Sequence, residues 1–217
     1  MRVELGHEVS ADDIVDLQPD AVVAANGGRV ELPTIPGSDL PHVQNGQALR
    51  DRFGGWRERL VRPRAVRMAS RAWMPLGHRV VIVGADLVAL ELAEFLAARG
   101  RLVSVLEADK TIAPELGNKR KTEHMNRLDL LAVAVHVRAP VDEIVPDGVV
   151  FTPFGGTSRR LAADSVIIAG TLQPNTELRE KLVAALPNTA VHAAGDCTGL
   201  GLIRKATKDG ARAACAI

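Results

Sequence analysis

Apolar residues along the chain gather in short runs that stop at glycine. Residues 21–25 form one such run before Asn26-Gly27-Gly28, and residues 79–83 form another before Gly84. A continuous apolar run bounded by glycine is typical of a buried strand followed by a sharp turn. Largely apolar segments predict further strands at 102–106, 133–137, 165–169 and 190–194; glycine follows only the last two.

Other segments repeat their apolar residues at helical spacing. Leu90, Ala93 and Ala97 predict a helix over 87–99, which Gly100 ends. Ser10 precedes acidic residues and is the expected N-cap of a short helix. Two more helices are expected, at 118–131 and at 203–217.

The order of these elements predicts an α/β fold. Strand, glycine turn, helix and strand follow one another over residues 79–107, which is the pattern of a βαβ unit with parallel strands. Residues 141–163 alternate around turns at Pro146-Asp147-Gly148 and Gly155-Gly156, so we expect an antiparallel β-meander there. We therefore predict a Rossmann-like three-layer domain that includes a meander.

Two segments of the chain are similar to each other. Residues 21–28 and 165–172 are both apolar runs that turn on glycine. We expect them to be neighbours in one sheet that an inserted domain interrupts.

Residues 29–75 contain many prolines and glycines and are expected to be loop-rich. The segment 57–67 is locally basic. A solvated face or a crossover between domains explains it; a nucleic-acid patch is the alternative, which the lack of interleaved aromatic residues disfavours.

Composition and charge exclude several classes of protein. Of the 217 residues, 47% are hydrophobic and 24% charged, which excludes a disordered or collagen-like chain. The net charge of +1 and the aromatic content of 3% argue against a nucleic-acid or membrane partner. No stretch reaches the roughly 18 apolar residues of a membrane helix.

Cysteine and histidine give no sign of a metal site. Cys197 and Cys215 form neither a disulfide framework nor a C-x-x-C pair, so we interpret both as structural and expect a reducing, cytoplasmic setting. The six histidines show no metal-ligand spacing. No nucleophile and base stand in a recognisable pattern, so no catalytic residue is predicted.

The turn after residue 83 aligns with the dinucleotide fingerprint G-x-G-x-x-G. Gly84 is the first glycine, Ala85 follows it, and Ala89 is a small residue in place of the third glycine. Asp86 replaces the second glycine, which normally lets the backbone approach the pyrophosphate. At ~4 Å and an effective dielectric of about 20, each carboxylate–phosphate pair would cost roughly 4 kcal/mol. Two hypotheses remain: an altered pyrophosphate site, or a fold that has lost the site.

Two acidic residues follow strands. Glu107 ends the strand after the fingerprint helix, where an acid usually binds the adenosine ribose and selects NAD over its phosphorylated form. Its alternative is a solvated residue beside Lys110. Asp196 follows Gly195 after an apolar run, and on pattern alone a helix cap is favoured over a ligand role.

Four motifs together resemble a known superfamily. DAVVAANGGRVELPTIPG (20–37), RVVIVGADLVALELAEFLAARG (79–100), DSVIIAGTLQPNTEL (164–178) and VHAAGDCTGLGLIRKATKDGARAACAI (191–217) stand in the order found in flavoprotein reductases with two dinucleotide-binding domains. The nearest likeness is to the C-terminal region of the group of 2,4-dienoyl-CoA reductase, enoate reductase and trimethylamine dehydrogenase. This resemblance implies an NAD-type domain at 76–162, inserted between partial FAD-type segments at 1–75 and 163–217.

The resemblance also implies the site. It places Asp196 against the ribityl or ribose part of FAD or ADP, and adds the turn residues Gly27, Gly170 and Gly195 to the fingerprint residues. NAD(H) is the expected partner of the inserted domain. FMN and a four-iron cluster are expected only in an N-terminal barrel of the parent protein, which this chain lacks. The chain departs from the family pattern at Asn26, which replaces threonine, and at Asp86; no G-x-G-x-x-G precedes residue 20.

Three functions follow. The chain is a truncated piece of a flavin-dependent oxidoreductase that passes hydride or electrons between nicotinamide and flavin, and is inactive in isolation. Alternatively, it is a non-catalytic nucleotide-binding or structural module, as in amine dehydrogenases. In the third, the fragment binds nothing tightly because half of its site is absent.

Overall fold

The computed structural model of the protein describes residues 2–46, 48–49 and 74–217, and its contacts divide the chain into two compact units. Unit 1 comprises Met1–Glu31 and Leu172–Ile217, and unit 2 comprises Leu32–Thr171. The basic segment 57–67 lies outside the described residues.

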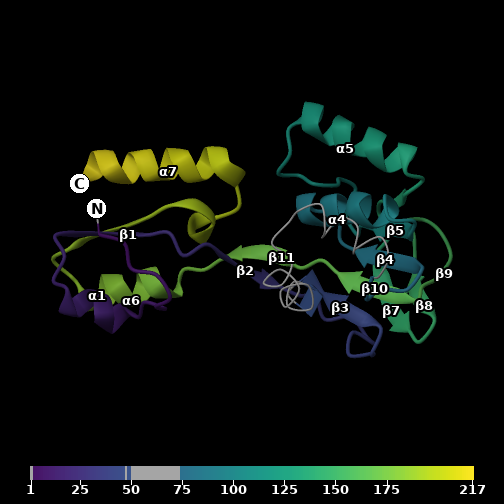
Figure 1. Ribbon diagram of the computed structural model, residues 1–217, viewed down its shortest axis with the longest axis horizontal. Coiled ribbons are helices and arrows are strands. Elements are labelled where there is room, and N and C mark those ends of the chain that lie inside the picture. The colour runs from purple at the N-terminus through teal and green to yellow at the C-terminus, as the bar shows by residue number, and fades with distance from the viewer. Residues whose placement is uncertain (1, 47, 50–73) are drawn as a thin grey trace. The chain divides into compact units, whose positions relative to one another are not determined.

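Unit 2 is built on a five-stranded parallel sheet (Figure 1). Its strands lie in the order β3 (Val43–Asn45), β10 (Ser165–Ile168), β4 (Arg79–Val83), β5 (Leu102–Leu106) and β6 (Ala134–His136). Parallel sheets are covered on both faces, which explains the continuous apolar runs of the central strands. The predicted βαβ unit is confirmed.

Helices and a meander cover the two faces of this sheet. Val81 and Val83 of β4 pack in one hydrophobic cluster with Ile144, Val149 and other residues of the meander. The meander consists of the antiparallel strands β7 (Val141–Val145), β8 (Gly148–Phe151) and β9 (Arg159–Ala162). Because side chains alternate along a strand, Val80 and Ile82 point to the other face, toward the helix layer.

The helix layer contains α4 (Leu87–Ala97), which joins β4 to β5, and α5 (Asn118–Leu130), which packs on α4. Alanine and leucine residues of α4 form its buried stripe, and His124 of α5 contacts Glu94 of α4 through Nδ1 and Oε1 at 2.5 Å. The predicted Rossmann-like three-layer α/β class with a meander is confirmed.

Unit 1 contains two small sheets and three helices. The parallel strands β1 (Ala21–Ala24) and β12 (Ala190–Ala193) form one sheet, and β2 (Gly28–Glu31) and β11 (Thr171–Pro174) form the other. The helices are α1 (Ala11–Asp16), α6 (Glu177–Ala185) and α7 (Leu202–Ala216), and the 3₁₀ turn η1 covers Gly195–Thr198. Ser10 caps α1 as predicted and forms a capping box with Asp13.

The predicted pairing of segments 21–28 and 165–172 in one sheet is wrong for their main strands. β1 pairs with β12, whereas β10 lies between β3 and β4. β10 is buried along its whole length, which suits a central position in a parallel sheet. Unit 2 therefore extends beyond the predicted inserted segment 76–162 at both ends, since it takes in β3 and β10.

In the part of the chain that the structure describes, every helix is too short or too polar to cross a membrane. The cytoplasmic location inferred from the sequence stays a prediction. Among the same residues, no group of His, Cys, Asp and Glu side chains is arranged to hold a metal ion.

Candidate functional site

The turn between β4 and α4 requires the glycine that the fingerprint places there. Gly84 has φ +99°, and a Cβ on it would lie 3.1 Å from the carbonyl oxygen of Ala169. Its N–H donates to the carbonyl of Leu106 at 2.8 Å. Ala85 and Ala89 are buried beside it, each 1% exposed.

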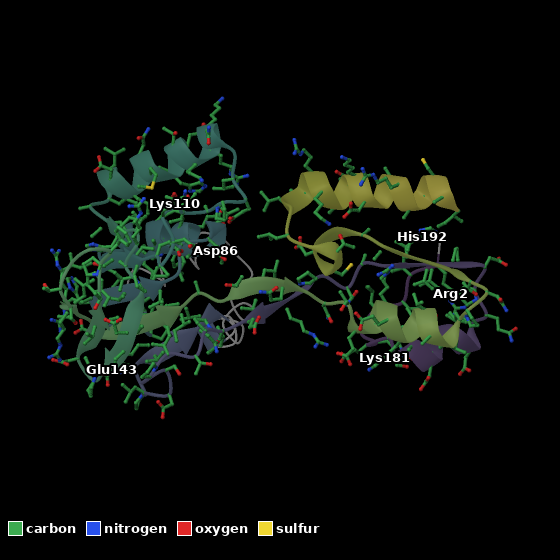
Figure 2. All side chains as sticks on the ribbon, turned by 180° about the vertical axis from the view of Figure 1, so that it is seen from behind. Arg2, Asp86, Lys110, Glu143, Lys181 and His192 are labelled. Carbon is green, nitrogen blue, oxygen red and sulfur yellow. The ribbon has the colours of Figure 1, made fainter. Side chains whose placement is uncertain are left out.

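Asp86 is the N-cap of α4 (labelled in Figure 2). Its Oδ1 accepts a hydrogen bond from the N–H of Ala89 at 2.7 Å. The departure from the fingerprint therefore replaces a flexible glycine with a side chain that satisfies one of the free N–H groups of the helix.

Glu107 is held by backbone groups through both of its oxygens. Oε2 accepts from the N–H of Ala85 at 2.8 Å, and Oε1 accepts from the N–H of Asp109 at 2.9 Å. In this geometry the carboxylate, for which a ribose role was predicted, faces the turn itself.

A third carboxylate, which sequence reasoning missed, completes the turn. Glu115 Oε1 accepts from the N–H of Leu87 at 2.6 Å. Glu115 lies in the loop after β5, where three buried apolar residues anchor the chain: Ile112, Ala113 and Leu116. The N–H of Ala113 also donates to the carbonyl of Ala85 at 2.7 Å, so the loop packs directly on the turn.

The three carboxylates affect one another. Burial raises the pKa of Asp86, the hydrogen bond from Ala89 opposes this, and the charges of Glu115 and Glu107 raise it further. Glu115 Oε2 is buried and has no hydrogen-bond partner among the described residues.

The fingerprint implies that this turn binds a dinucleotide. A pyrophosphate binds a helix N-terminus through free N–H groups and the positive end of the helix dipole. Here the N–H groups of Ala85, Leu87 and Ala89 already donate to carboxylates. The turn as it stands does not fit a pyrophosphate.

Unit 1 carries the remaining predicted residues except Gly170. Gly27 (φ +75°) follows β1, and Gly195 (φ +81°) follows β12. Because β1 and β12 are parallel and paired from Ala21 with Ala190, these two turns lie at the same edge of their sheet. Ligands of α/β folds bind at this carboxyl edge.

Asp196 lies in η1 at this edge and is half-buried. Its carboxylate accepts no hydrogen bond from the residues that the structure describes. It is therefore available to accept from hydroxyl groups, and together with the two glycine turns it fits the hydroxyl-bearing part of a nucleotide.

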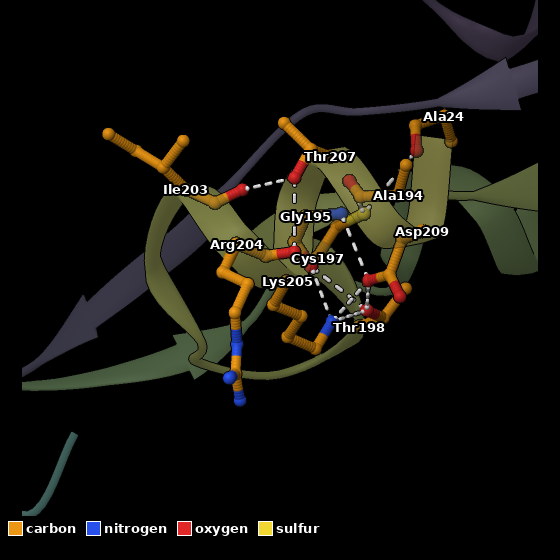
Figure 3. Close-up of polar contacts among 10 residues, drawn as sticks. All are labelled: Ala24, Ala194, Gly195, Cys197, Thr198, Ile203, Arg204, Lys205, Thr207 and Asp209. Carbon is orange, nitrogen blue, oxygen red and sulfur yellow. Dashed lines mark hydrogen bonds and ion pairs between the residues drawn. The ribbon is translucent and has the colours of Figure 1, made fainter. Parts of the chain in front are cut away.

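A charged cluster that sequence reasoning missed fixes the η1 turn (Figure 3). Lys205 Nζ of α7 donates to the carbonyl of Gly195 at 3.1 Å, to Thr198 Oγ1, and to Asp209 Oδ2 at 2.5 Å. The hydrogen bond from Lys205 lowers the pKa of Asp209. The i, i+4 spacing of Lys205 and Asp209 was the available signal in the sequence.

The predicted cofactor residues fall into two groups. Gly84, Ala85, Asp86, Ala89 and Glu107 meet at the α4 turn of unit 2, and Gly170 lies between β10 and β11, half-buried. Gly27, Gly195 and Asp196 lie in unit 1. Cys197 is buried with its Sγ 3.2 Å from the carbonyl oxygen of Ala194, whereas Cys215 is exposed.

Comparison with known protein families matches residues 2–210 to the pyridine nucleotide-disulphide oxidoreductases. The chain belongs to this family. A pyridine nucleotide-disulphide oxidoreductase domain implies FAD and NAD(P)H as cofactors, and this confirms the predicted two-nucleotide flavoprotein class.

Curated relatives of this pyridine nucleotide-disulphide oxidoreductase chain are longer enzymes. It is 26% identical to the NADH oxidase of Thermoanaerobacter brockii over 97% of this chain and 30% of the relative. It is 27% identical to the CoA-dependent NAD(P)H sulfur oxidoreductase of Pyrococcus furiosus over 78% of this chain and 35% of the relative. The chain thus spans about a third of the length of these relatives.

Solved structures show the same arrangement of elements. A complex of 2-naphthoyl-CoA reductase matches 99% of this chain and 29% of its own, with a TM-score of 0.77 and 26% identity. The 6-hydroxypseudooxynicotine amine oxidase of Pseudomonas geniculata matches 96% of this chain and 30% of its own, with a TM-score of 0.72 and 24% identity, which shows a shared fold.

Proposed function

We propose that the chain is part of a flavin-dependent oxidoreductase in the group of dienoyl-CoA reductases, enoate reductases and amine dehydrogenases. The similarity to 2-naphthoyl-CoA reductase over 99% of the chain supports this group. The NADH oxidase and sulfur oxidoreductase relatives support a flavin- and NAD(P)H-linked oxidoreductase more generally. In the whole protein, an N-terminal barrel with FMN and a four-iron cluster would complete the electron path.

In this proposal unit 1 belongs to the FAD-type domain and unit 2 contains the NAD-type domain. The observation that carries the nucleotide role is the carboxyl edge of β1 and β12. There, two glycine turns with positive φ stand beside the carboxylate of Asp196, which has no hydrogen-bond partner among the described residues.

The residues of unit 1 would bind and orient the nucleotide. The Asp196 carboxylate accepts hydrogen bonds, so it would hold ribityl or ribose hydroxyl groups. Lys205 and Asp209 hold the η1 turn in place, which keeps the backbone of Asp196 fixed. FAD, when bound, supplies the redox chemistry, and the protein supplies its position.

A second candidate function is a non-catalytic module that binds FAD or ADP without receiving hydride from a nicotinamide. The carboxylates of Asp86, Glu107 and Glu115 at the α4 turn favour it, since they occupy the N–H groups that NAD(H) would need.

Thermal unfolding with FAD and with ADP tests the nucleotide role in both candidates. A specific ligand at about 100 times its dissociation constant should stabilise the chain by about 2.7 kcal/mol. We expect this shift in the wild type and its loss in Asp196→Ala. Asp16→Ala removes another exposed carboxylate of unit 1 and serves as the matched control, which should keep the shift. The absence of a shift with either ligand, or an unchanged shift in Asp196→Ala, would contradict the proposal.

A further inference from the structure

We infer that the turn between β4 and α4 excludes a dinucleotide, because three carboxylates of the chain itself occupy the backbone N–H groups that a pyrophosphate requires. The inference extends the proposed oxidoreductase function. It rests on that function only in taking a nicotinamide dinucleotide as the ligand that is excluded. It decides against nicotinamide binding at this turn.

Two of the occupied groups, Leu87 N–H and Ala89 N–H, belong to the first turn of α4, and the third, Ala85 N–H, lies in the glycine turn just before it. The first N–H groups of a helix have no partner within the helix, and they bind phosphate when a glycine turn leaves them open. In this chain Ala85 N–H donates to Glu107, Leu87 N–H to Glu115 and Ala89 N–H to Asp86, at 2.8, 2.6 and 2.7 Å. Each of these N–H groups is therefore already paired with a carboxylate oxygen of the chain.

The arrangement is built into the fold from three different segments. Asp86 belongs to the turn, Glu107 follows β5, and Glu115 lies in the loop that Ile112, Ala113 and Leu116 bury against the unit. The backbone bond from Ala113 to Ala85 fixes that loop on the turn. A dinucleotide would have to displace all three side chains, and it would bring two phosphate charges among three carboxylates, where like charges repel.

Unit 2 then supports the fold of the oxidoreductase without serving as its nicotinamide site. A nicotinamide dinucleotide that reacts with the flavin of the whole protein must bind outside this turn.

Calorimetric titration of the full chain with NADH tests the inference, combined with hydrogen exchange of the amides of residues 85–89. For the wild type we expect no protection of these amides at NADH concentrations up to about 1 mM, at which even a millimolar ligand would be half-bound. The variant D86G/E115Q frees the Ala89 N–H and removes two charges, so we expect it to bind NADH at least about tenfold more tightly and to show protection at 85–89.

Three further variants make the test specific. E123Q/E143Q neutralises two exposed carboxylates elsewhere on unit 2 and should behave like the wild type. Asp86→Ser retains an oxygen that can cap α4 but removes the charge, so it carries the test if D86G/E115Q fails to fold. In that case we expect Asp86→Ser to gain several-fold in NADH affinity relative to Glu123→Gln.

The outcomes separate this inference from the proposed function. NADH that protects amides 85–89 of the wild type overturns it, and so does a folded D86G/E115Q with no gain over the control. NADH bound by the wild type without protection of these amides supports it, because the ligand is then outside the turn. Binding of FAD or ADP, measured separately, tests the proposed function and is independent of all four variants.

Discussion

Asp86 combines a stabilising contact with an unfavourable charge. As an N-cap it satisfies the Ala89 N–H, a contact worth about 1 kcal/mol in comparable helices. Its burial, with Glu115 and Glu107 nearby, disfavours the ionised form and raises its pKa. The same residue thus closes the turn and stabilises the helix that begins there.

Asp164 shows the opposite electrostatic situation. It accepts hydrogen bonds from the side chain and the backbone N–H of Arg79, and these contacts lower its pKa to about 2 from an ordinary 3.8. Between these two values the unfolded chain binds more protons than the folded chain, so this contribution to stability rises with pH from about 2 to 3.8 and is lost as pH falls.

We predict that Asp164→Asn reduces the pH dependence of unfolding in this window. The free energy of unfolding, from urea titrations at pH values between about 2 and 4, should rise less steeply in the variant than in the wild type. Asp142→Asn removes the same single charge from another aspartate of unit 2 and serves as the control, which should keep the wild-type slope. An Asp164→Asn slope equal to that of the wild type would contradict the assignment.

At the residue scale, the sequence predicted which residues lie at the α4 turn better than it predicted their contacts. Gly84 and Asp86 could be located because a fingerprint fixes their spacing relative to a strand and a helix. The contact of Glu115 with Leu87 could not, because it depends on how a loop of irregular sequence packs on the turn. The position of Glu107 at the end of β5 was predicted correctly, but its backbone partners depend on the same packing.

Short elements and loops show why the fold was predicted only in part. The strands β4, β5 and β10 have long apolar runs and were predicted within a residue or two. β2, β3 and β11 have three or four residues each and carry polar side chains, so no periodicity marks them. α6 was missed although Leu182 is fully buried, because its other residues are mainly polar or small.

Gly37 connects the loop before β3 to the meander. Its φ is +82°, and a Cβ there would lie 2.0 Å from the carbonyl oxygen of Ile144. The N–H of Ile144 donates to the carbonyl of Pro36 at 2.8 Å, so the two segments meet at backbone distance.

We predict that Gly37→Ala destabilises the protein by about 2 kcal/mol or more, since it combines left-handed backbone strain with a steric clash. Gly100→Ala is the matched control, because Gly100 has φ +78° but nothing within 4 Å of a Cβ. It should cost only about 1 kcal/mol. Midpoints of urea unfolding compare the two, and equal destabilisation would show that the contact with Ile144 is not restrictive.

At the scale of the whole molecule, each unit has its own buried residues. Leu182 of α6 is fully buried in unit 1, and Leu128 of α5 is fully buried in unit 2. Local stability can therefore be perturbed in one unit at a time.

We predict that Leu182→Ala destabilises unit 1 by about 2–5 kcal/mol through the cavity it creates. Hydrogen exchange should accelerate in β12 and α6 and remain unchanged in β4 and β10. Leu128→Ala should give the reverse pattern. Equal acceleration in both units by either variant would show that the chain unfolds as one cooperative body.

The chain passes between the units at two points, 31/32 and 171/172, and the strands at these points, β2 and β11, are neighbours in one small sheet. Unit 2 is thus a single continuous stretch of sequence that leaves and re-enters unit 1 at one place. Unit 2 is therefore an insertion in the sequence of unit 1, and substitutions within it leave the two flanking segments unchanged. Asp86, Glu107 and Glu115 all lie within unit 2, so substitutions that open the α4 turn leave the residues at the carboxyl edge of β1 and β12 in unit 1 unchanged.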